Sequence, residues 1–230
     1  MGMPIAWLVL ATVAFVGSHF LLSHPLRGPL VKAVGLKAFQ TLYSLVAIVT
    51  LVWMVLSFDA VPDGPMLWDG HAAVPWVAAS VLTFVAIALL LASFTGNPAL
   101  PGARIAGLSA ILPRGVYKIT RHPMMFAFAL WALAHILVAP TPRSFVLTGG
   151  ILVLALGGAH MQDRKKEKLH GRDWRSWLKR TNYWPDLRKA NELGWYWGLA
   201  VLPWLFITWL HLPAAGIPAG IWRAIFVGNY

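Results

Sequence analysis

The chain has 230 residues, of which 58% are hydrophobic and only 12% are charged. A soluble domain carries about 25% charged residues, and a water-soluble fold of this length has too little interior to cover so much apolar surface. The net charge of +11 does not indicate nucleic-acid binding, because the cations lie between apolar stretches, where they meet lipid headgroups. The absence of cysteine excludes disulfides, cysteine-based zinc sites and covalent c-type haem attachment.

Six stretches are long and apolar enough to cross a membrane as helices, each of which needs about 20 residues. None of them contains an internal Asp, Glu, Lys or Arg residue. In chain order they are Ile5–Leu22, Phe39–Phe58, Ala73–Phe94, Pro123–Ala139, Ser144–Met161 and Leu193–Leu212. This pattern predicts an all-α, polytopic transmembrane bundle of about six spans that forms one domain over residues 1–230.

The loops between these stretches differ in charge. Loops 23–38, 95–122 and 162–192 hold three, four and ten of the 19 Lys and Arg residues, whereas loop 59–72 carries only acids. The positive-inside rule makes the cation-rich face cytoplasmic, so both termini are predicted on the outer side. The basic segment 162–192, which has interleaved tryptophans, is predicted to lie along the cytoplasmic membrane surface against anionic lipid.

Histidine is the only ionisable side chain left as a candidate for chemistry inside the spans. His19 and His135 lie deepest, whereas His160 and His211 lie near span ends. Ionisable groups at membrane depth are costly and often functional, and a neutral imidazole is a common ligand for transition metals and haem iron. A histidine can equally hydrogen-bond a backbone carbonyl, so the residues alone leave both roles open.

The segment from Thr120 to Pro123 opens the fourth span. Pro123 suits the first turn of a helix, where no hydrogen-bond donor is lost, and Thr120 is placed to cap that turn. Arg121 and His122 put cations at a helix N-terminus, where the helix dipole disfavours them. An anion is therefore expected beside them, either a lipid phosphate or the carboxylates or phosphates of a bound cofactor.

At these residues the chain resembles the NnrU family of bacterial membrane proteins. The most recognisable segment runs from Gly115 to His135 and contains the Arg-His-Pro triplet. Supporting pieces are Ser18-His19, His24-Pro25-Leu26-Arg27, Leu42-Tyr43-Ser44-Leu45, Gly96-Asn97-Pro98 and Asp163-Arg164-Lys165-Lys166 followed by Gly171. The resemblance implies a bacterial inner membrane protein associated with nitrite and nitric oxide reduction in denitrification.

The family is related to a plant carotenoid isomerase that carries a haem b, so the resemblance also implies haem b and redox-gated isomerisation. Carried over, the axial haem ligands fall on His19 and His135. Arg27, Arg121 and His122 are predicted to bind the cofactor, the two arginines through its propionates. Ala132 stands where the isomerase has a cysteine, which puts a thiol-based ligand switch in doubt.

Two other functions remain open at this point. The Arg-His-Pro triplet also resembles membrane methyltransferases of the isoprenylcysteine and phospholipid kind, although Met125 and Ala127 replace the expected tyrosine and glycine. A non-catalytic assembly factor that docks on a respiratory reductase through the basic segment is the third interpretation.

Overall fold

The computed structural model describes residues 3–100, 102–103 and 105–226, and all regular secondary structure in these ranges is helical. The α-helices are α1 (Met3–Ser23), α2 (Arg27–Val34), α3 (Leu36–Asp59), α4 (Ala73–Ala92), α5 (Val116–Ile119), α6 (Pro123–Val138), α7 (Pro142–Leu152), α8 (Gly158–His170), α9 (Arg172–Arg180), α10 (Tyr196–Ala215) and α11 (Trp222–Phe226). Three short segments of other helix types are η1 (Leu108–Ala110), η2 (Val153–Gly157) and η3 (Leu187–Leu193).

Five helical stretches in the described ranges are long and apolar enough to cross a membrane, namely α1, α3, α4, the continuous stretch α7–η2–α8 and α10. The predicted all-α, multi-pass membrane class is confirmed. α6, the fourth predicted span, is apolar but has 16 residues, so at 1.5 Å per residue it is about 24 Å long. The fifth predicted span continues as helix to His170, and the sixth begins at Tyr196.

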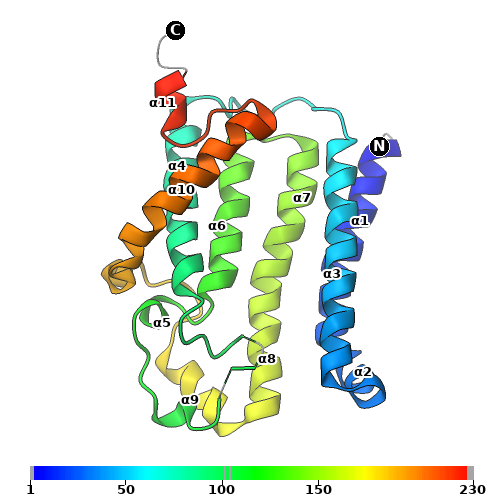
Figure 1. Ribbon diagram of the computed structural model, residues 1–230, viewed down its shortest axis with the longest axis vertical. Coiled ribbons are helices and arrows are strands. Elements are labelled where there is room, and N and C mark those ends of the chain that lie inside the picture. The colour runs from blue at the N-terminus through cyan, green and yellow to red at the C-terminus, as the bar shows by residue number, and fades with distance from the viewer. Residues whose placement is uncertain (1–2, 101, 104, 227–230) are drawn as a thin grey trace.

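The long helices run side by side along the long axis of the molecule (Figure 1). α6 lies between α4 and α7, α7 lies between α6 and α1, α3 packs on α1, and α10 crosses obliquely against α4. α2, α8 and α9 lie at one end, which we call the basic end, whereas the start of α1 and α11 both lie at the opposite end (Figure 1). The two outermost parts of the described chain therefore share one end of the bundle.

Hydrogen bonds attach each end of α6 to a different end of the bundle. At the basic end the Arg121 amide donates to the Asn182 carbonyl at 2.9 Å. At the opposite end the indole of Trp68, in the loop between α3 and α4, donates to the Leu137 carbonyl at 2.9 Å. α6 thus connects the two ends even though it is shorter than its neighbours.

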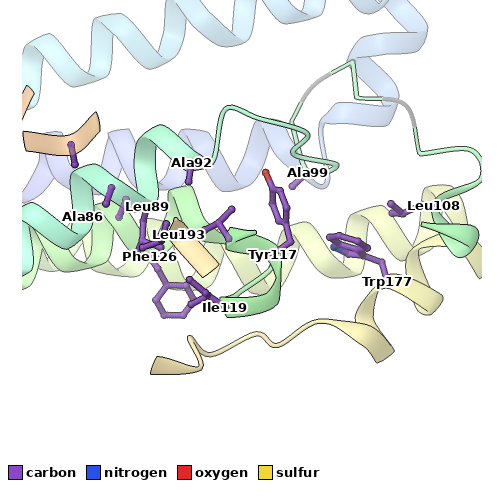
Figure 2. Packing of buried hydrophobic residues seen from close by; sticks show 14 of the residues in the cluster. Ala86, Leu89, Ala92, Ala99, Leu108, Tyr117, Ile119, Phe126, Trp177 and Leu193 are labelled. Atoms are coloured by element: carbon purple, nitrogen blue, oxygen red, sulfur yellow. The ribbon is translucent and has the colours of Figure 1, made fainter. Parts of the chain in front are cut away.

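The larger hydrophobic cluster lies where α4, α5, α6 and α9 meet, as Figure 2 shows. Ala86, Leu89 and Ala92 of α4 contribute to it together with Phe126 and Ala127 of α6. Small residues such as these alanines let two helix backbones approach closely, which is how helices associate inside a membrane. Among the described helices, α4 and α6 have the most extensive contact.

The tryptophans of α9 belong to this cluster and not to the membrane surface. Trp174 is fully buried and Trp177 is 3% exposed, next to Tyr117. α9 folds under the bundle, where Arg180 donates to the carbonyls of Leu108 and Ser109. The predicted surface position of segment 162–192 is therefore corrected for α9, because the apolar side of α9 faces protein.

Candidate functional site

The two histidines predicted to share one haem iron lie on helices that are not neighbours. His19 is on α1, close to the basic end, and its Nδ1 lies 2.7 Å from the Phe15 carbonyl. His135 is on α6, close to the opposite end, and its Nδ1 lies 2.8 Å from the Trp131 carbonyl. α7 packs between α1 and α6 (Figure 1). The structure does not bring His19 and His135 to one site, so as a pair they do not fit a single haem.

His135 lies instead beside His211 of α10. Their ring centroids are 6.3 Å apart, and the ring planes are inclined by 31°. The Nδ1 atom of His211 lies 2.9 Å from the Ile207 carbonyl, so in both rings Nε2 is the nitrogen left for another partner. Two imidazoles bound to opposite sides of one metal have ring centres roughly 6 Å apart, since each metal–nitrogen bond is about 2.0 Å. The separation of the His135 and His211 ring centres is of the same size.

The described residues contain no group of three or more His, Cys, Asp or Glu side chains placed to hold a metal ion. A metal ion held by protein alone usually needs three or four such ligands. A pair of imidazoles therefore suits a metal that brings its own equatorial ligands. Haem iron is such a metal, because the porphyrin supplies four nitrogens and the protein supplies the axial histidines.

Arg121 and His122 meet an anion of the same chain, the Asp163 carboxylate of α8. Arg121 Nε donates to Asp163 Oδ2 at 2.8 Å, and His122 Nε2 lies 3.0 Å from Asp163 Oδ1. The second contact does not meet hydrogen-bond geometry, so it is a close approach of the ring nitrogen to the carboxylate. The anion expected at the start of α6 is thus supplied by the protein.

Backbone carbonyls of segment 181–183 hold the same cluster. Arg121 also donates to the Thr181 carbonyl at 3.1 Å, and its guanidinium carbon lies 5.3 Å from the centre of the Tyr183 ring. Thr120, predicted as a helix cap, donates instead to the Tyr183 carbonyl at 2.6 Å and accepts the His122 amide at 3.2 Å. Burial, followed by the charge of Asp163, raises the pKa of Tyr183. Arg121 is therefore engaged by protein groups and does not need a haem propionate.

A cavity of about 180 Å³ lies next to this cluster. It is lined by Asn97, Ala99, Leu100, Arg121, His122, Met124, Met125 and Gln162. The His122 side chain is fully buried, and its Nδ1 has no hydrogen-bond partner among the residues that the structure describes. An imidazole beside a carboxylate with one open nitrogen can exchange a proton with a small polar guest. The volume is below the roughly 300–1,000 Å³ of pockets for organic ligands.

Arg27 lies in a separate cavity at the basic end, between the α1–α2 turn and α8. Its neighbours there are cations of α8, and neither His19 nor His135 lines this cavity. The three residues predicted to bind the cofactor are therefore divided between two cavities, with Arg121 and His122 in one and Arg27 in the other.

A family model described as "NnrU protein" matches residues 7–219. The chain belongs to the NnrU family. The match covers nearly the whole chain and confirms the resemblance that the Arg-His-Pro segment carries in the sequence.

This NnrU protein is also similar to a curated plant protein, "15-cis-zeta-carotene isomerase, chloroplastic" from Arabidopsis thaliana. The two are 29% identical over 195 residues, which cover 80% of this chain and 52% of the plant protein. The chain therefore spans about half the length of this relative. No solved structure matches the NnrU protein significantly.

Two residues of the candidate site, His211 and Asp163, were noted in the sequence but not predicted as site residues. His211 sits near the end of the last long helix, where a histidine is ordinarily a surface residue, and only the crossing of α10 places it near His135. Asp163 did carry a signal, because it is the first acid after the fifth span and directly precedes a basic run. Its partners Arg121 and His122 lie 42 and 41 positions earlier in the sequence, so spacing alone could not pair them.

Proposed function

We propose that this NnrU protein is an isomerase-like enzyme of the bacterial inner membrane that holds haem b between His135 and His211 and acts on an apolar, conjugated substrate dissolved in the bilayer. The similarity to a carotene isomerase supports the reaction class and the substrate class. The observation that carries the cofactor is the 6.3 Å separation of two imidazoles whose Nε2 atoms have no partner on their own helices.

Haem b, when bound, supplies one-electron redox chemistry. The residues of this chain would hold and orient it. The hydrogen bond from each Nδ1 to a carbonyl one helical turn back fixes the ring orientation and the tautomer that leaves Nε2 as the metal ligand. Trp131, whose ring centroid lies 4.2 Å from that of His135, limits the rotation of that imidazole. An apolar substrate would reach this site through lipid, because Trp131 and Leu133 of α6 are exposed on the outer surface of the bundle.

The test of the cofactor is the visible absorption spectrum of detergent-purified protein made with ample haem, recorded oxidised and reduced. A Soret band that His135→Ala and His211→Ala each shift or remove supports the proposed ligand pair. His19→Ala is the matched control, because it also removes a helix-bonded imidazole but leaves the pair intact. A spectrum that responds to His19→Ala and not to His211→Ala would overturn the assignment, and the absence of a Soret band would end the haem proposal.

The proposal includes six membrane crossings, with α6 as the fourth and both termini in the periplasm. It is supported by the hydrogen bonds of α6 to both ends of the bundle and by the position of α1 and α11 at one end. The loops that hold 17 of the 19 Lys and Arg residues, three, four and ten in turn, are assigned to the cytoplasm.

Single cysteines test this orientation without background, because the chain has none of its own. Pro65 in the loop between α3 and α4 and Lys32 in α2 are exposed positions at opposite ends. A membrane-impermeant maleimide applied to intact spheroplasts should label Pro65→Cys and should label Lys32→Cys only after lysis. The reverse pattern would invert the topology, and equal labelling of both would contradict it.

The association with nitrite and nitric oxide metabolism is tested separately. A deletion strain that loses nitrite reduction, together with co-purification of the protein with a respiratory reductase and no turnover by the isolated protein, would favour the assembly-factor function over isomerisation. Turnover of a cis-carotene by the purified protein alone would favour isomerisation.

A further inference from the structure

The second cavity of the molecule lies at the basic end and has a volume of about 490 Å³. Its polar lining consists of Ser23, His24, Arg27, Arg164, Lys165 and Lys168, which we call the cationic cavity. It is formed between the turn that joins α1 to α2 and one face of α8. None of the residues that line it is an acid.

Four formal positive charges thus face one space without a counter-ion from the protein. Within the described ranges no carboxylate lies within 4.0 Å of the cationic groups of Arg27, Arg164, Lys165 or Lys168. The two acids of α8 point elsewhere, since Asp163 is paired with Arg121 and Glu167 lies 3.8 Å from Arg175. The charged side chains that α8 presents to the cavity are therefore all cations.

The spacing of these cations shows how the sequence builds that face. Arg164 and Lys168 are four residues apart and so lie one above the other on α8, with Lys165 beside them. Arg27 reaches the same space from the α1–α2 turn, 137 positions earlier in the chain. Like charges at such spacing destabilise a helix surface, and in a folded protein a bound anion relieves that repulsion.

The pKa of His24, which lines the same cavity, is sensitive to the positive charge there. Burial, followed by the charge of Lys165, lowers the pKa of His24. An imidazole whose cationic form is disfavoured by both effects adds no further charge at neutral pH but can donate one hydrogen bond to an anion.

We infer that the cationic cavity is a binding site for a phosphate group. Two guanidinium groups and two ammonium groups match the several oxygens and the charge of a phosphate, whereas a single carboxylate would leave most of these donors unused. An exposed apolar side chain borders the cavity, since Leu169 is 53% exposed. This side chain fits an acyl chain of an anionic phospholipid, and inorganic phosphate offers the same headgroup chemistry without the acyl chain. The inference is independent of the haem proposal.

The experiment compares two variants that lose the same charge. Arg164→Gln with Lys168→Gln removes two cations from the cavity, and Arg172→Gln with Lys179→Gln removes two exposed cations from α9 at the same end. Each protein, purified in a neutral detergent, is titrated at constant ionic strength with dioctanoyl phosphatidylglycerol, with dioctanoyl phosphatidylcholine and with inorganic phosphate. Thermal unfolding followed by tryptophan fluorescence reports the binding, and size-exclusion elution confirms that each variant is folded.

The wild-type protein and the α9 variant should be stabilised by phosphatidylglycerol at the same concentrations, and the cavity variant should need at least about tenfold more, since two charge-assisted hydrogen bonds are lost. Stabilisation by inorganic phosphate as well would identify a soluble phosphate as the source, whereas phosphatidylglycerol alone identifies the lipid. Equal responses of the two variants, or equal effects of phosphatidylcholine and phosphatidylglycerol with none from phosphate, would overturn the site. The haem spectrum is recorded in parallel, so failure of one proposal is distinguishable from failure of the other.

Discussion

Two sets of cations lie at the basic end of the molecule, and they are neutralised differently. Arg121 and His122 share the Asp163 carboxylate, and the Thr181 carbonyl accepts a second hydrogen bond from the guanidinium of Arg121. Arg27 and the cations of α8 face the cationic cavity without any acid of the described chain. The protein itself supplies the anion for the first set. The second set has no acid within the described residues, so its anion must come from a bound molecule.

This difference separates structural charge from binding charge. A buried cation paired within the chain holds the fold together, because either partner alone would be a desolvated charge. Cations gathered without an acid weaken the fold unless a ligand arrives. Substitutions in the two sets should therefore change stability in opposite directions.

The largest effect is expected from Asp163→Asn. This change leaves the Arg121 guanidinium, whose side chain is 12% exposed, and the fully buried His122 without their anion. Breaking a buried pair by removing one partner costs about 3–5 kcal/mol, so the thermal unfolding midpoint in detergent should fall strongly. Glu167→Gln is the control, because its pair with Arg175 is exposed and should cost at most about 1 kcal/mol. Equal losses for the two variants would show that the first set is not structural.

The second prediction concerns His24, the titrating group at the edge of the cationic cavity. The charged groups that line the same cavity are Arg27, at the start of α2, and Arg164, Lys165 and Lys168 of α8. A bound phosphate places negative charge beside the imidazole and favours its protonated form, so the lowered pKa of His24 should rise. An NMR titration of labelled histidine with and without dioctanoyl phosphatidylglycerol measures this, with His71 as the exposed reference. An unchanged pKa of His24 would place the phosphate elsewhere.

Many features of the fold and of the two sets of cations could be predicted from the sequence, because they depend on the local pattern of apolar and charged residues. The apolar stretches gave five helices of spanning length and one shorter one, and Pro123 begins α6 as expected. An anion was expected beside Arg121 and His122, but from a lipid or a cofactor, whereas the structure places Asp163 of the same chain there. What local pattern cannot reveal is which helices are neighbours.

That limitation explains the differences at the histidines and at α9. α7 separates His19 from His135, and the oblique crossing of α10 brings His211 to His135, although nothing in the periodicity of either helix specifies its partner. In a membrane protein the side of a helix that faces lipid is as apolar as the side that faces protein. The tryptophans of α9 could for this reason be assigned to the membrane surface by pattern, whereas they pack under α4 and α6.

A smaller effect, of opposite sign to that of Asp163→Asn, is expected from Lys165→Met. The substitution keeps the apolar stem of a half-buried side chain and removes one of four mutually repelling charges in the cationic cavity. Without added lipid or phosphate the variant should be unchanged or more stable, by up to about 1 kcal/mol. Thermal unfolding in a phosphate-free buffer measures it. A clear loss of stability would mean that Lys165 has a partner within the chain, and the contrast between the two sets would then fail.

The smallest effect is expected on the heat of binding when S-adenosylmethionine is added. This experiment tests whether the first set, Arg121 and His122 with Asp163, excludes large ligands. The cavity beside His122 has a volume of about 180 Å³, which is too small for a cofactor that combines a nucleoside with an amino acid, given that organic ligands occupy roughly 300–1,000 Å³. Arg121 and Asp163, the charges that could bind its carboxylate and amine, already bind each other. Titration calorimetry should therefore show no saturable heat. Saturable binding that is lost in Asp163→Asn and kept in Glu167→Gln would instead make this cluster a cofactor site. The methyltransferase interpretation would then replace isomerisation, because the Arg-His-Pro segment would bind a ligand rather than stabilise the fold.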